Sequence, residues 1–63
     1  MIIKKAYGDD SYIIMNLTTI EFDKHTGVTT LIGKLIDEKD CEEFREYNEV
    51  CLIMNENIEV IEQ

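Results

Sequence analysis

The chain has 63 residues and a formal net charge of −8 at pH 7, so it allows one small domain, residues 1–63. A domain of this size buries only about 60% of the surface that its unfolded chain exposes. Direct nucleic-acid binding is disfavoured, because that function needs a basic stripe.

The first residues lack the apolar core of a signal peptide, and the longest apolar run, Val50 to Met54, is far below the ~20 residues of a membrane helix. We therefore expect a cytoplasmic protein without membrane contact. Its lack of proline and its many Ile, Glu, Lys and Asn residues fit a phage or low-GC bacterial origin.

Two cysteines, Cys41 and Cys51, are ten residues apart in the chain. This spacing does not fit a C-x-x-C motif, and no second pair of cysteines could complete a zinc site. A single disulfide is sterically possible, but we expect two buried, reduced thiols that pack as small hydrophobic side chains. Oligomerisation then remains as the source of extra stability for so small a domain. The chain is accordingly predicted to form a homo-oligomer without a metal or other cofactor.

The first part of the chain is typical of β-structure. Residues 1–7 and 12–16 predict two strands, because apolar side chains dominate both. The Gly, Asp and Ser residues at 8–11 predict the turn between these strands. We expect a bend or bulge at Asn16-Leu17, since residues 12–23 would otherwise form one unusually long strand.

Residues 17–36 contain the clearest local signal, a β-hairpin. Two Thr-rich apolar runs flank a polar segment at 23–27. In that segment, Gly27 can adopt the left-handed conformation that closes a short loop, and the Asp23 carboxylate can accept backbone N–H groups. In the second arm, Gly33 predicts a bulge, a sharp bend or the close approach of another backbone.

A short helix is predicted over residues 38–48, which contain many helix-forming residues. Cys41, Phe44 and Tyr47 occur at every third position and would form its narrow apolar stripe. Phe44 is expected to meet Phe22 of the hairpin in the core, where the helix would pack on the sheet.

Two further strands are predicted at 50–54 and 58–61, with a turn at 55–57 between them. The resulting element order is ββββαββ. It indicates an α+β fold, a small antiparallel β-sheet or partly closed barrel with one short helix.

Charge is unevenly distributed along the chain. Residues 1–36 contain four acidic residues and four lysines, whereas residues 37–63 contain ten acidic and two basic residues and so carry the whole excess of −8. On the predicted helix, four carboxylates at spacings of four, four and three would share one face: Glu38, Glu42, Glu46 and Glu49. Such a row can keep a small protein soluble. It can also dock on a basic protein and occupy a channel that otherwise holds nucleic-acid phosphates.

Catalysis and metal binding find little support in the sequence. His25, the single histidine, lies in the predicted hairpin loop without a partner that would hold it as a base. The acidic residues do not follow the spacing of a calcium-binding loop. A chain of this size can scarcely enclose the apolar pocket in which a carboxylate becomes a general acid. We therefore expect neither an enzyme nor a metal site.

The sequence favours a small acidic interaction module that inhibits or regulates a basic, nucleic-acid-handling protein by mimicking nucleic acid. The four glutamates and Tyr47, a candidate anchor at the rim of an interface, are the predicted binding residues. The first alternative is a homo-oligomeric assembly subunit with Tyr12, Ile14 and Ile53 at the interface between copies. The second alternative is sequestration of a small ligand at an oligomer interface.

Overall fold

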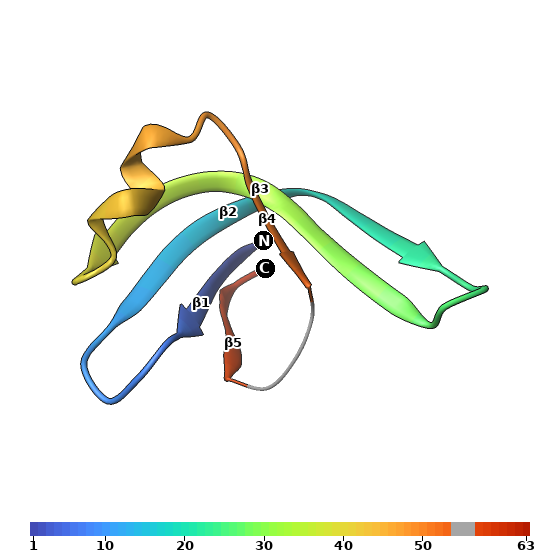
Figure 1. Ribbon diagram of the computed structural model, residues 1–63, viewed down its shortest axis with the longest axis horizontal. Helices are drawn as coiled ribbons and strands as arrows, with labels where there is room; N and C mark the ends of the chain where they lie inside the picture. The colour runs from blue at the N-terminus through green and yellow to red at the C-terminus, as the bar shows by residue number, and fades with distance from the viewer. Residues whose placement is uncertain (54–56) are drawn as a thin grey trace.

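The computed structural model describes residues 1–53 and 57–63, which form a curved, five-stranded antiparallel sheet (Figure 1). The strands are β1 (Ile2–Ala6), β2 (Tyr12–Asp23), β3 (Val28–Lys39), β4 (Val50–Ile53) and β5 (Ile58–Glu62). A short 3₁₀ helix, η1 (Glu42–Glu46), connects β3 to β4. The order across the sheet is β4-β3-β2-β1-β5, so β4 and β5 are the edge strands. Within the described ranges, no helix is long and apolar enough to cross a membrane.

The fold is β-rich, and the α-helix expected over residues 38–48 is not found. Strand β3 continues to Lys39, and the only helical segment in the described part of the chain is η1, with 3₁₀ geometry. The α+β class is therefore not confirmed. The physical reason is the regular three-residue spacing of Cys41, Phe44 and Tyr47. A 3₁₀ helix has three residues per turn and aligns such positions, whereas an α-helix needs alternating spacings of three and four.

Strand β2 joins the two strands that were expected over 12–16 and 17–23, and it carries the expected bulge. Its register against β3 shifts between Leu17 and Thr19, so that Thr18 is the extra residue. The bulge brings the β2 backbone very close to Gly33. A Cβ atom at that position would meet the carbonyl oxygen of Asn16. The predicted bulge and the predicted close approach at Gly33 are both confirmed.

The loop of the β2–β3 hairpin is closed as the sequence predicts. Gly27 has a φ angle of 75°, and its N–H donates to the carbonyl oxygen of Asp23 at 2.7 Å. The Asp23 carboxylate accepts the backbone N–H of His25 at 2.9 Å.

The core lies on the inner face of the curved sheet. Its buried residues are Ile3, Ile13, Met15, Leu31, Cys41, Val50 and Leu52. Phe22 is not among them, because the end of the hairpin is not flanked by β1 or β4 and extends away from the rest of the sheet (Figure 1). Its side chain is 65% exposed, so the expected core contact between Phe22 and Phe44 is wrong.

The last two strands agree closely with the predicted ones. Strand β4 begins at Val50 and β5 at Ile58, the two positions at which the sequence places them. Met54, at the end of the predicted fifth strand, lies outside the described residues, as do residues 55 and 56 of the predicted turn.

Candidate functional site

Acidic residues are frequent along the segment that runs from the end of β3 through η1 to the start of β4. Six exposed carboxylates lie between residues 37 and 49: Asp37, Asp40, Glu42, Glu43, Glu46 and Glu49. Together with Tyr7, Phe44 and Tyr47, we call this region the η1 surface.

The predicted row of four glutamates is not formed by one helix face. Glu38 belongs to β3, Glu42 and Glu46 lie in η1, and Glu49 precedes β4. Residues four apart in a 3₁₀ helix point about 120° away from each other, so Glu42 and Glu46 face different directions. The four carboxylates are therefore not aligned along one face.

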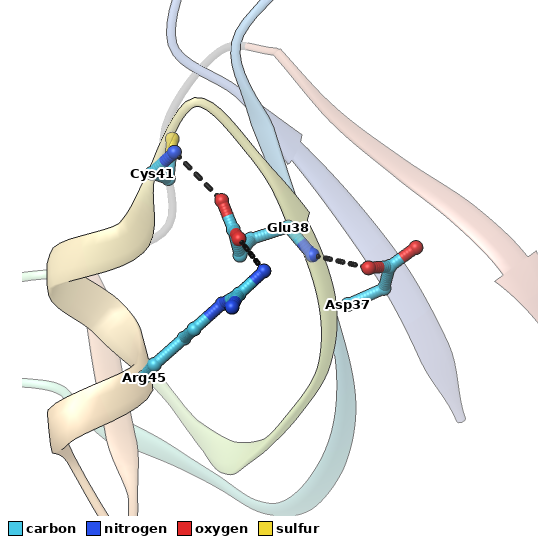
Figure 2. Close-up of polar contacts among 4 residues, drawn as sticks. All are labelled: Asp37, Glu38, Cys41 and Arg45. Atoms are coloured by element: carbon cyan, nitrogen blue, oxygen red, sulfur yellow. Dashed lines mark hydrogen bonds and ion pairs between the residues drawn. The ribbon is translucent and has the colours of Figure 1, made fainter.

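Glu38 attaches η1 to the sheet (Figure 2). Its side chain is only 4% exposed, and its Oε1 pairs with Nη2 of Arg45. Its Oε2 accepts the backbone N–H of Cys41 at 2.8 Å, and its own N–H donates to Oδ1 of Asp37 at 2.8 Å. A buried carboxylate requires such partners. The Glu38 carboxylate is thus directed toward the protein's own groups and not toward a binding partner.

Three aromatic rings form the centre of the η1 surface. Tyr7, next to the end of β1, stacks on Phe44 with ring centroids 5.6 Å apart. Tyr47 meets the same ring edge to face at 6.5 Å. Phe44 is half-buried, whereas Tyr7 and Tyr47 are 46% and 61% exposed. Phe44 therefore holds two exposed tyrosines in place. Sequence reasoning missed Tyr7, because its role depends on a contact with a residue far along the chain.

The Tyr7 hydroxyl remains protonated at neutral pH. Partial burial raises the pKa of Tyr7, and the nearby Cys41 and Glu43 raise it further. The ammonium of Lys5 lies 5.2 Å from the centroid of the Tyr7 ring, where a cation is attracted by the ring's π electrons. The Tyr7 hydroxyl thus remains a neutral hydrogen-bond donor.

A surface hollow of about 350 Å³ lies beside Tyr47. It is lined by Phe44, Tyr47, Glu49, Val50 and Cys51. Two aromatic walls and one carboxylate suit a cationic side chain, which gains from ring faces and from a charged acceptor.

The residues predicted for an interface between copies do not form one patch. Tyr12 and Ile14 are half-buried near the start of β2, and Ile53 is 63% exposed at the end of β4. Ile14 is paired with Asp37 of β3, and Ile53 is paired with Thr30 of the same strand. From the rise per residue of a strand, Asp37 and Thr30 are roughly 20 Å apart.

Neither a metal cluster nor a known relative guides the assignment. Within residues 1–53 and 57–63, no group of three or more His, Cys, Asp and Glu side chains is arranged to hold a metal ion. His25 is exposed in the hairpin loop. No protein-family model, curated protein or solved structure matches the chain. The function is therefore argued from the surface itself.

The two cysteines differ in environment. Both are free thiols, with Cys41 buried and Cys51 exposed, so the expectation of two buried thiols is wrong for Cys51. Strand alternation explains this difference, because the flanking Val50 and Leu52 occupy the inner face. Burial raises the pKa of Cys41, and three nearby carboxylates raise it further.

We expect iodoacetamide at pH 8 to alkylate Cys51 in the folded protein and to spare Cys41. The thiolate is the reactive form of cysteine, and burial disfavours this form at Cys41. Intact-mass measurement should show one adduct before denaturation and two adducts in urea. Equal rates at both sites in the folded protein would contradict the packing of Cys41 under η1.

Proposed function

We propose that the protein is a small interaction module whose η1 surface binds a basic, nucleic-acid-handling protein and inhibits or regulates it. The observation that carries this proposal is the pair of exposed tyrosines held against Phe44 among carboxylates. Tyrosine is enriched at the energetic centres of interfaces. Because the rings already contact each other, binding costs less side-chain entropy than it would with free side chains.

The chemistry of the surface favours a cationic partner. Residues 37–49 contain seven acidic residues and two basic ones, a charge excess that attracts a basic protein and speeds the encounter. A lysine or arginine in the hollow would face the Tyr47 ring and the Glu49 carboxylate. A groove that binds nucleic-acid phosphates presents several such cations together. Occupation of the groove by carboxylates would exclude the nucleic acid.

Charge reversal of Glu42 and Glu46 together should weaken partner binding by about 2 kcal/mol, or roughly 30-fold. Both side chains are exposed, so folding should be unchanged. Tyr47→Ala should cost a similar amount, because it removes an aromatic anchor. The wild-type protein, immobilised, is used to capture its partner from host lysate. Calorimetry with the purified partner at two salt concentrations then gives the affinities.

The matched control is Glu59→Lys with Glu62→Lys, which changes the net charge equally at the exposed surface of β5. We expect this control to keep most of the affinity, and the wild-type affinity to fall at high salt. Wild-type protein should also release DNA or RNA from the partner in a competition assay. The proposal fails if charge reversal in η1 and charge reversal in β5 lower the affinity for the partner equally.

A further inference from the structure

The end of the β2–β3 hairpin extends away from the rest of the sheet (Figure 1). Strand β1 pairs with β2 only as far as Asn16, and β4 pairs with β3 only from Thr30 to Gly33. In the described structure, residues 18–29 are therefore a two-stranded ribbon. A two-stranded hairpin is at best marginally stable in water, and cover of an apolar face is what normally stabilises it.

Ile20 and Phe22 lie on the inner face of this ribbon. Ile20 is opposite Leu31, which is in turn opposite Leu52, and residues directly opposite in an antiparallel sheet share a face. Leu31 and Leu52 are core residues with exposures of 4% and 8%, whereas Ile20 and Phe22 are 55% and 65% exposed. The apolar face of the core thus continues outward beyond its cover.

We propose that a second copy of the chain covers this face, so that two hairpins pack with their inner faces together about a twofold axis. The distribution of charge supports a contact at this place. The ribbon contains Glu21, Asp23 and Lys24, a formal charge of −1, in a chain of net charge −8. Both carboxylates alternate with Ile20 and Phe22 and so belong to the outer face. The inner face of the ribbon strands therefore brings no carboxylate of one strongly acidic copy directly against the other.

The size of the contact predicts a weak, reversible dimer. A twofold axis uses each residue twice, so Ile20 and Phe22 supply four apolar side chains. Even with an aromatic area of 150–250 Å² per ring, the contact remains below the ~800 Å² per partner of a standard interface. The tip of the hairpin and η1 lie at opposite ends of the molecule (Figure 1). A dimer of this kind therefore leaves both η1 surfaces accessible.

Sedimentation equilibrium between about 10 μM and 1 mM should show a monomer–dimer equilibrium. Phe22→Lys should raise the dissociation constant at least tenfold. Ile53→Lys should leave this constant unchanged, because it introduces the same charge at a side chain of similar exposure, 63%, outside the ribbon. A wild-type protein that stays monomeric at 1 mM would overturn the proposal. A dimer that survives Phe22→Lys but is lost in Ile53→Lys would also overturn it.

Cross-linking tests the face directly and does not depend on a stable lysine variant. In a Cys51→Ser background, Phe22→Cys is compared with Glu21→Cys, its neighbour on the outer face of the same strand. Mild oxidation should produce covalent dimers at least ten times faster for Phe22→Cys, because only that thiol would meet its copy. Equal rates would show random collision and would sink the inner-face contact.

Discussion

Gly33→Ala is expected to leave the protein unfolded, or nearly so, at 25 °C. A Cβ at this position would clash with the carbonyl oxygen of Asn16. It would lie 2.9 Å from the carbonyl carbon of Asn16 and 2.9 Å from Cα of Leu17. All three atoms belong to the backbone of β2, so no side-chain rotation can relieve the clash. Overpacking costs about 1–3 kcal/mol and more where backbone must move. A core of this size supplies only about 3–5 kcal/mol of net stability.

Urea unfolding followed by circular dichroism measures this effect, with Gly8→Ala as the control. A Cβ at Gly8 would have no atom within 4 Å, so this variant should change the free energy of unfolding by less than about 0.5 kcal/mol. A wild-type midpoint for Gly33→Ala would mean that the β2 bulge does not cross over this residue.

The hairpin could be predicted from sequence because its signals are local. The loop depends on the left-handed conformation of Gly27 and on a hydrogen bond from the N–H of His25 to the Asp23 side chain. Both effects act within a few residues and need no tertiary context. Gly33 differs, because its contact with β2 is not local. It could be recognised because a glycine inside a strand already indicates an unusual backbone contact.

The end of β3 could not be predicted in this way. Residues 37–39 are charged, yet they pair with Ile14, Ile13 and Tyr12 of β2, and this long-range pairing outweighs local helix propensity. The spacing of Cys41, Phe44 and Tyr47 has the period of three of the 3₁₀ helix that forms there, and not the period of the predicted α-helix. The predicted row of aligned carboxylates depended on an α-helix and is lost with it. The exposure of Tyr47 and the local acidic charge do not depend on an α-helix, and both remain in the proposed site.

The stack of Tyr7 on Phe44 is a second feature that the sequence does not disclose. Tyr7 follows β1, and Phe44 lies in η1. Their rings are in contact only because strand pairing in the sheet brings the end of β1 close to η1. The centre of the proposed binding surface is therefore a product of tertiary structure. The acidic residues around it follow one another in the chain and could be recognised directly.

Glu38→Ala is expected to destabilise the protein by about 2–3 kcal/mol, because it removes a charged acceptor from the N–H of Cys41. Arg45 is 67% exposed, so its ion pair should contribute less than about 1 kcal/mol. Glu38→Gln keeps an acceptor oxygen and loses only the charge. It should therefore cost about as little as Arg45→Ala, which removes the other partner of the ion pair.

These three variants, measured by urea unfolding, separate the two roles of the buried carboxylate. If the hydrogen bond to Cys41 anchors η1, Glu38→Ala is much less stable than Glu38→Gln. Because η1 contains Phe44 and is followed directly by Tyr47, Glu38→Ala should also weaken partner binding, whereas Glu38→Gln should not. If Glu38→Ala left the free energy of unfolding unchanged, the Glu38 carboxylate would be free in solution. The predicted helix over residues 38–48 requires this arrangement. The carboxylate would then be available to a basic partner beside Glu42.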